Sequence, residues 1–306
     1  MINLLGTLPF WRVGPWPKEP FMLGNVPLQI HSFGLMVALG LLIGISWLSW
    51  RSEKKEGIDG EQIQNFSLFL VFIGWPLSHV FNVIFYEPHL ILEDPFELFR
   101  VWGSISSYGG LFGGMIAFAI WVYRHPEHRA IKWAEIAVMG LIIPWFFGRM
   151  GCGLVHDHPG AIAPDWWPLA LEFPTTSKLP GGPRHDLGFY EAIWWGVILV
   201  IFQILDRKPR RRGFYVGLIP VLYAPARFTF DFFRVPYDLG GDARYLGLTP
   251  AQYFSIAIFV IGVIWLRRSL KNPVVEWKEF ERGGSAPSED SAAEEKSEEK
   301  KDKSDD

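Results

Sequence analysis

The chain of 306 residues is long enough for two soluble domains or one polytopic membrane domain, and its composition favours the membrane domain. Hydrophobic residues make up 49% of the chain, while charged residues concentrate in short gaps and in the C-terminal tail. No broad basic face is apparent, which argues against nucleic acid as a partner. The single cysteine, Cys152, excludes an internal disulfide framework and any CxxC metal site.

Seven apolar stretches follow one another along the chain, and most reach the ~20 residues that a helix needs to cross a bilayer. They cover residues 29–50, 64–86, 104–123, 132–154, 187–205, 213–231 and 250–267. The first stretch is too long for a cleavable signal and has no basic segment before it. We therefore predict an all-α integral membrane protein with about seven transmembrane helices.

The seven stretches also divide the chain into four segments. Residues 1–28 would be an external N-terminal segment, and residues 29–267 the seven-span membrane domain. Residues 268–282 would form a cytoplasmic juxtamembrane segment. Residues 283–306 are Ser, Ala, Glu, Lys and Asp without periodicity, which predicts a disordered charged tail.

Lysine and arginine mark alternate gaps between the stretches. The gaps after the first, third, fifth and seventh stretches hold Arg51, Lys54 and Lys55; Arg124, Arg129 and Lys132; Arg207, Lys208, Arg210, Arg211 and Arg212; and Arg267, Arg268 and Lys271. Positively charged gaps stay in the cytoplasm. This pattern predicts an external N-terminus and a cytoplasmic C-terminus.

Small residues recur at helix-packing spacing in two of the stretches. The pairs are Gly40 with Gly44, Gly109 with Gly113, and Gly110 with Gly114. Glycines four residues apart let two helix backbones approach closely, which is the interpretation we favour. A glycine surface beside a lipid headgroup is the alternative.

The first polar cluster ends the fourth stretch and contains Arg149, His156, Asp157 and His158 among several glycines. Ionisable residues within a membrane span are functional candidates because they are costly to insert. A guanidinium can bind phosphate through two parallel hydrogen bonds. The two histidines and the aspartate also resemble a metal cluster, but no further ligand set is evident, so we expect no metal.

A second cluster ends the sixth stretch, where Tyr223, Arg227, Asp231 and Arg234 lie three or four residues apart and share one helix face. These side chains are either a binding site or an ion-pair ladder that locks two helices together.

A third cluster, containing Arg184, His185 and Glu191, opens the fifth stretch, where the alternative is a solvated interfacial loop. His31 and Tyr108 open the first and third stretches, and each alone is typical of an interfacial anchor. The predicted topology brings all these residues to the outer side of the membrane, and this convergence predicts a functional site.

Together these motifs resemble one family, the prolipoprotein diacylglyceryl transferases of bacterial inner membranes, from about residue 25 to about residue 267. The matching positions are Gly34-Leu35-Met36; Gly109-Gly110; Gly148, Arg149, Gly151 and Gly160; Pro183-Arg184-His185 with Tyr190-Glu191; Tyr223, Arg227, Phe228 and Arg234; and Thr249 with Gln252. Six runs in order and at the right spacing identify the chain as a member of the superfamily.

The chain also departs from the family pattern at several positions. Cys152 and Val155 stand where the family has asparagine, Asp157 and Asp231 where it has glutamate, Tyr108 where it has histidine, and Phe33 where it has tyrosine. Aspartate keeps the charge on an arm shorter by one methylene, whereas cysteine and valine lose an amide hydrogen-bonding group. A divergent member with another acceptor, or with no activity, is therefore an alternative.

The resemblance implies transfer of diacylglyceryl from phosphatidylglycerol to the lipobox cysteine thiol of preprolipoproteins, forming a thioether at the outer face of the bacterial inner membrane. The partners would be phosphatidylglycerol, the signal-peptide region of the preprolipoprotein and the lipid bilayer, and no cofactor is needed. A non-enzymatic transporter is the competing class, but no paired half-length spans or internal repeat support it.

The resemblance also implies roles for single residues. Arg149 and Arg227 would hold the donor phosphate, and Asp157 and Asp231 would orient them. The remaining catalytic candidate is Tyr108, and the substrate-binding candidates are His31, Tyr223, Arg234, Arg184, His185, Glu191 and His156. His156, His158 and His185 are all eligible to deprotonate the thiol, and a catalytic Cys152 remains an alternative.

Overall fold

The computed structural model describes residues 8–14, 16–23, 26–85, 88–100, 103, 107–126, 129–164, 166–176, 179–236, 239, 241 and 244–274. Its long helices are α1 (Ser32–Glu56), α2 (Gly60–Phe85), α4 (Ser107–Arg124), α5 (Ala130–Val155), α6 (Leu187–Leu205), α7 (Phe214–Phe230) and α8 (Pro250–Ser269). The short helices are α3 (Pro88–Glu93), η1 (Pro95–Phe99) and η2 (Asp231–Phe233). The strands are β1 (Trp16–Leu23), β2 (Val26–Ile30), β3 (Pro159–Ile162), β4 (Leu171–Phe173) and β5 (Gly182–Asp186).

Within the described residues, six helices are long and apolar enough to cross a membrane: α1, α2, α5, α6, α7 with η2, and α8. The third predicted stretch falls on α4, whose apolar part, Gly109–Arg124, is shorter than the other six. The prediction of a mostly helical multi-pass membrane protein is therefore confirmed. The exact number of spans and the side on which each terminus lies stay predictions.

One predicted boundary differs clearly from the structure. Residues 51–55, which we expected in the first basic gap, continue α1 as its last turns. The helix ends only where Gly57 adopts a left-handed conformation (φ 61°) and its N–H bonds to Ser52. The charges are tolerated in the helix because Arg51 is buried against Asp206 at the end of α6.

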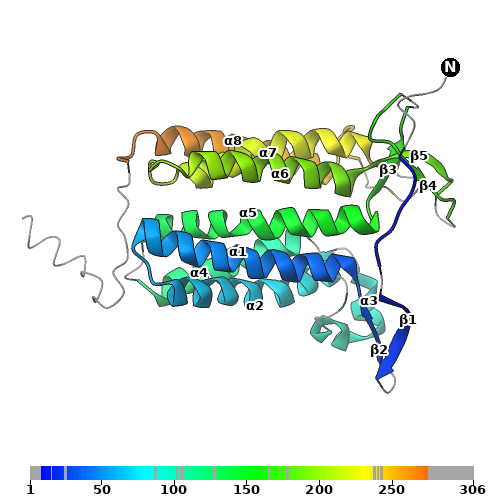
Figure 1. Ribbon diagram of the computed structural model, residues 1–306, viewed down its shortest axis with the longest axis horizontal. Coiled ribbons are helices and arrows are strands. Elements are labelled where there is room, and N and C mark those ends of the chain that lie inside the picture. Colours follow the sequence, from blue (N-terminus) through cyan, green and yellow to red (C-terminus); the bar gives the residue numbers. More distant parts are fainter. Residues whose placement is uncertain are drawn as a thin grey trace, which may run out of the picture.

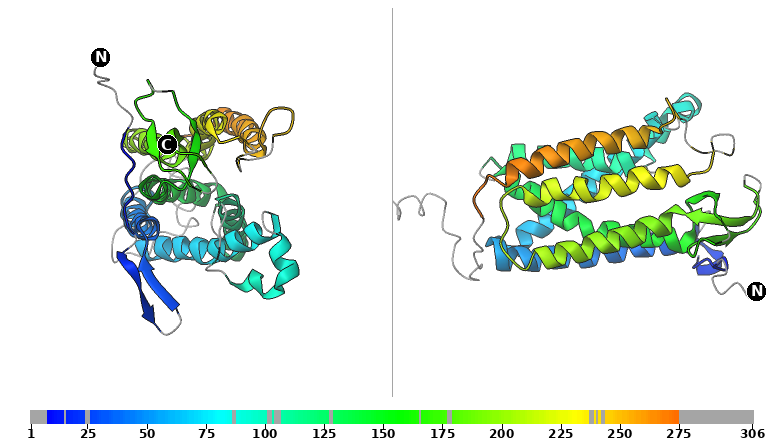
Figure 2. Two further views of the ribbon diagram at one scale, coloured as in Figure 1. Left: turned by 90° about the vertical axis from the view of Figure 1, so that its right-hand side faces the viewer. Right: turned by 90° about the horizontal axis from the view of Figure 1, so that it is seen from above.

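The long helices run side by side in one bundle (Figures 1 and 2). Helices α6, α7 and α8 form one side, α1, α2 and α4 form the other, and α5 lies between them (Figure 1). Helix α5 contacts α1, α4, α6 and α7. Because α5 has neighbours on both sides, side chains at its end can meet residues from most of the bundle.

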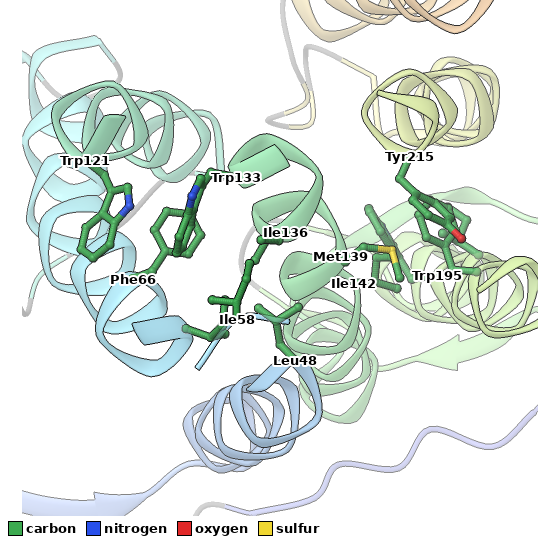
Figure 3. Close-up of a cluster of buried hydrophobic side chains, with 13 residues drawn as sticks. Leu48, Ile58, Phe66, Trp121, Trp133, Ile136, Met139, Ile142, Trp195 and Tyr215 are labelled. Carbon is green, nitrogen blue, oxygen red and sulfur yellow. The ribbon is translucent and has the colours of Figure 1, made fainter. Parts of the chain in front are cut away.

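A buried apolar cluster joins the two sides across α5 (Figure 3). Trp133 and Ile136 of α5 lie on the side of the cluster that holds Phe66 and Leu48, whereas Met139 of α5 lies on the other side. The same cluster continues to Trp195 of α6 and Tyr215 of α7. Large side chains of this kind supply most of the packing energy in such a core.

Glycines of α1 let that helix lie directly on α5. A Cβ atom at Gly40 would come within 2.7 Å of the Phe147 side chain, and one at Gly44 within 2.7 Å of the Pro144 ring. Similarly, a Cβ at Gly113 would come within 2.8 Å of the Gly74 carbonyl oxygen. These contacts support the packing interpretation for Gly40, Gly44 and Gly113.

The strands gather at one end of the bundle (Figures 1 and 2). Strands β3, β5 and β4 form an antiparallel sheet in that order, and β1 pairs with β2 as a hairpin. Strand β3 follows the end of α5, and β5 runs directly into α6. The predicted tail, residues 283–306, lies outside the described residues.

Candidate active site

A buried carboxylate joins two arginines from different helices at the end of the bundle that carries the strands. Arg149 lies near the end of α5, Glu191 near the start of α6 and Arg227 near the end of α7. Arg149 Nε is 3.0 Å from Glu191 Oε2, and Arg227 Nε is 3.9 Å from Glu191 Oε1. Only 4% of the Glu191 side chain is exposed, so this bridge forms away from bulk water.

Asp231 extends the same charge cluster toward the start of α8. Its Oδ1 accepts hydrogen bonds from Arg227 Nη1 at 2.5 Å and from Arg234 Nε at 2.7 Å. Its Oδ2 accepts a hydrogen bond from the Thr249 hydroxyl. The predicted shared face of Arg227, Asp231 and Arg234 is therefore confirmed as a set of contacts. Tyr223 packs its ring against Trp195, with ring centroids 5.2 Å apart.

Two residues outside the predicted site set fix this part of the cluster. Thr249 and Gln252 form a reciprocal capping box at the start of α8, and Gln252 Nε2 also donates to the Phe228 carbonyl oxygen at 3.1 Å. The Thr-x-x-Gln pattern was visible in the sequence as part of the family resemblance. The two residues cap the start of α8, and the cap also places the Thr249 hydroxyl beside Asp231.

A cavity of about 520 Å³ lies beside Arg149. Apolar side chains of α1, α2 and α5 line most of it, including Phe33, Leu41, Val71 and Trp145. Its polar lining residues are Ser78, Arg149, Cys152, Asp157 and His158. A mostly apolar cavity with a few polar groups at one place is typical of a site for an amphiphilic ligand.

The third predicted cluster is buried and holds the sheet against α6. Arg184 is 1% exposed and donates hydrogen bonds to the carbonyl oxygens of Gly160 and Pro180. His185 Nδ1 is 2.9 Å from the Tyr190 hydroxyl, and burial lowers the pKa of this histidine. The alternative of a solvated loop is therefore wrong for Arg184 and His185, while their contact with substrate stays a prediction.

The chain reverses at His156, and this reversal places the next two residues beside α5. His156 has φ 52°, and its N–H bonds to the Cys152 carbonyl oxygen. Its imidazole Nδ1 contacts Asp186, while the ring lies edge-on to Trp11. Asp186 also caps α6 by accepting from the Phe189 N–H, a contact that the Asp before the apolar run signals in the sequence.

Three further predicted residues have different outcomes. Asp157 pairs with His158 across 2.5 Å, and its expected contact with an arginine stays a prediction. His31 is exposed at the start of α1, at the same end of the bundle as the cluster. The Tyr108 side chain lies outside the described part of the structure.

The fold and this site define a class of protein: a multi-pass membrane protein in which Arg149, a member of a buried charge cluster, lines a mostly apolar cavity. The comparisons with known proteins agree. Residues 20–268 match the family model described as prolipoprotein diacylglyceryl transferase. The chain belongs to this family.

Several curated relatives carry the name phosphatidylglycerol–prolipoprotein diacylglyceryl transferase. One from Janthinobacterium sp. (strain Marseille) is 31% identical over 83% of this chain and 96% of its own length. One from Tolumonas auensis is 27% identical over 84% of this chain and 97% of its own length. One from Chromohalobacter salexigens is 31% identical over 82% of this chain and 93% of its own length.

Proposed function

We propose that this chain transfers the diacylglyceryl group of phosphatidylglycerol to a cysteine thiol of a prolipoprotein. The names of its relatives describe this reaction, and the matches extend over nearly the full length of each relative. The transporter alternative is not favoured, because the family is one of transferases. The acceptor thiol would be the lipobox cysteine beside the signal peptide, and the product a thioether.

One observation carries the proposal: Arg149, one member of the arginine cluster, lies at the wall of the apolar cavity. Arg149 belongs both to the cavity lining and to the ion pair with Glu191. Arg149, Arg227 and Arg234 face two carboxylates, Glu191 and Asp231, which leaves one formal positive charge in the cluster. This charge matches a phosphodiester monoanion, while the cavity suits the acyl chains.

The reaction breaks one C–O bond and forms one C–S bond. The thiolate of the acceptor attacks the glycerol carbon that carries the phosphate ester, and the bonding electron pair leaves with the phosphate oxygen. The products are the thioether and glycerol phosphate. The proton of the thiol passes to a base, and the departing phosphate changes from a monoanion toward a dianion, so nearby guanidinium groups stabilise the transition state more than the ground state.

Each residue of the cluster would have a separate part in this step. Arg149 would bind the phosphate directly because it lines the cavity. Glu191 and Asp231 would orient Arg149 and Arg227, because their carboxylates contact these guanidinium groups. The choice of base among His156, His158 and His185 stays open. Burial lowers the pKa of His185, which favours the neutral imidazole that a base requires.

A reconstituted assay tests the proposal. The purified protein is placed in nanodiscs that contain phosphatidylglycerol, and a lipobox peptide is added. Mass spectrometry should find the peptide heavier by one diacylglyceryl group, with glycerol phosphate released in equal amount. Nanodiscs that contain only a zwitterionic phospholipid, and a peptide with serine for the acceptor cysteine, serve as controls. Headgroup release without peptide modification, or no reaction at all, would contradict the proposal.

A further inference from the structure

The wall of the cavity also carries three different metal-binding side chains. Cys152, Asp157 and His158 each offer a ligand atom, and these atoms lie within 4.8 Å of one another. All three residues line the cavity. We propose that they bind a divalent zinc ion, whose fourth coordination position opens into the cavity.

The turn at the end of α5 explains how the three side chains meet. Cys152 is buried on the last turn of α5. The left-handed conformation of His156 then turns the chain back, so that Asp157 and His158 return to the Cys152 side. The three ligands therefore come from one short segment whose backbone already has the required path.

The chemistry of the set matches zinc better than the hard cations. Thiolate, imidazole and carboxylate are all zinc ligands, whereas magnesium and calcium prefer oxygen donors alone. Three protein ligands with one open position are also the usual arrangement of a reactive zinc site. Asp157 and His158 already contact each other through Oδ1 and Nδ1. Each of these two side chains has a second possible ligand atom, Oδ2 and Nε2.

The distances require only a small adjustment. Zinc bonds of about 2.0–2.3 Å place tetrahedral ligand atoms about 3.3–3.8 Å apart. The atoms must therefore close in by about 1 Å from separations of up to 4.8 Å. Asp157 and His158 are 43% and 33% exposed at their side chains, so they have room to move toward the buried thiol.

The positive charge of Arg149 repels a cation at this site, and neighbouring groups reduce this repulsion. It interacts with the Cys152 thiol, and its charge is balanced by Glu191 at 3.0 Å. The Cys152 thiolate and the Asp157 carboxylate would supply two negative charges that balance the charge of the zinc ion. The resulting centre stays close to neutral, which a half-buried cavity wall can hold.

Direct metal binding tests the site without any reference to turnover. The full-length protein, purified in detergent and freed of metal, is titrated with Zn²⁺ against a chromophoric chelator and then with Co²⁺ as an optical probe. We expect one zinc per chain and a thiolate-to-Co²⁺ charge-transfer band. Cys152→Ser should abolish the band and weaken zinc binding by about 100-fold or more, as loss of an anionic zinc ligand requires.

His158→Gln is the second variant, because its partly exposed side chain can be replaced with little risk to folding. It should weaken zinc binding while it keeps the thermal unfolding temperature of the wild type. His89→Gln, on α3 and outside the cavity, is the matched control and should bind zinc like the wild type. Equal zinc affinity in the wild type and the Cys152→Ser and His158→Gln variants, or no stoichiometric binding, would overturn the proposal.

Inhibition by zinc is a separate arm that rests on the proposed transferase function. Because the metal would share the cavity with Arg149, zinc should slow the transfer to a lipobox peptide, and Cys152→Ser should transfer at the same rate with and without zinc. If zinc binds but no transfer is seen in any condition, the proposed function fails and the metal site stands. If transfer is seen but zinc does not bind, the metal site fails and the proposed function stands.

Discussion

Glu191 on α6 and Arg149 on α5 form a buried ion pair, with Oε2 and Nε 3.0 Å apart, at the wall of the apolar cavity. The other carboxylate oxygen of Glu191 lies 3.9 Å from Arg227 Nε. One acidic residue thus lies between two cations from separate helices, and Asp231 also holds the second of them. An anionic group in the cavity would meet a guanidinium that is already held in place, which lowers the reorganisation that the reaction requires.

Replacement of Arg149 should reduce the transfer rate far more than it reduces the amount of folded protein. Arg149→Ala removes a charged donor to the departing phosphate, which by analogy with oxyanion sites costs about 100- to 1,000-fold in kcat. Arg149→Lys keeps the charge but loses the bidentate fork, so it should rescue little. Turnover per folded molecule in nanodiscs is the measurement.

Arg100→Ala is the matched control, because this exposed arginine directly follows η1 and forms local ion pairs with Asp94 and Glu97. It should transfer like the wild type. If Arg149→Ala also turned over normally per folded molecule, Arg149 would be part of a structural ion pair and no longer a candidate for the phosphate.

Glu191→Gln should destabilise the protein and also slow the reaction. The amide keeps the shape of the side chain but leaves Arg149 and Arg227 buried without the carboxylate between them. Loss of one partner from a buried ion pair costs about 3–5 kcal/mol of unfolding free energy. Thermal unfolding and turnover should be measured on the same preparation. Unchanged stability together with unchanged turnover would contradict the bridging role.

Much of this arrangement is predictable from the sequence. Apolar length predicts the long helices, six of which are long and apolar enough to span a membrane, and i, i+4 spacing brings Arg227 to Asp231. The contact of Arg149 with Glu191 is not predictable from spacing, because these residues lie on different helices whose relative rotation depends on packing across the whole bundle. The contact of Asp157 with His158 is not predictable from the sequence either, because it depends on the left-handed turn at His156.

The burial of Arg51 is a second feature that the sequence does not predict. A lysine- and arginine-rich segment predicts a solvated gap, and this is correct on average. In this chain α1 continues through that segment because Asp206 at the end of α6 supplies a buried partner. The partner lies 155 residues away in the sequence, so no local pattern signals it.

Acidification should weaken the sheet of β3, β5 and β4 through His185. Burial lowers the pKa of His185 in the folded protein below its usual value of 6.5, so the unfolded chain binds its proton more readily. The stabilising contribution is therefore complete above about pH 6.5 and is lost as the pH falls below that value. Its neighbours include the Tyr190 hydroxyl and the rings of Trp167 and Phe233.

The measurement is the thermal unfolding temperature between about pH 7.5 and pH 5. In the wild type this temperature should fall on acidification, and in His185→Gln the fall should be smaller. His89→Gln, at an exposed position on α3, should keep the wild-type slope. An identical slope in all three proteins would exclude His185 as the source.

A substitution at the opposite end of α6 should separate stability from activity. Asp206 accepts hydrogen bonds from Arg51 at 2.7 and 2.9 Å and from Lys55 at 2.8 Å, with 5% of its side chain exposed. Asp206→Asn keeps the volume but removes the carboxylate that Arg51 and Lys55 share, and Glu56, 3.2 Å from Arg51, remains as the ion-pair partner of that buried guanidinium. The substitution should therefore cost about 3 kcal/mol of unfolding free energy, the lower end for a broken buried pair. Glu61→Gln, an exposed carboxylate at the start of α2, should change the stability little.

The turnover of the folded Asp206→Asn protein should remain that of the wild type. Asp206 follows Glu191 by fifteen helical positions, which corresponds to about 22 Å along the axis of α6. The ion pair of Arg149 with Glu191 therefore keeps its geometry when the far end of the helix loosens. A fall in turnover per folded molecule as large as that of Arg149→Ala would mean that the two ends of α6 are coupled. The arginine cluster could then no longer be treated as a locally organised site.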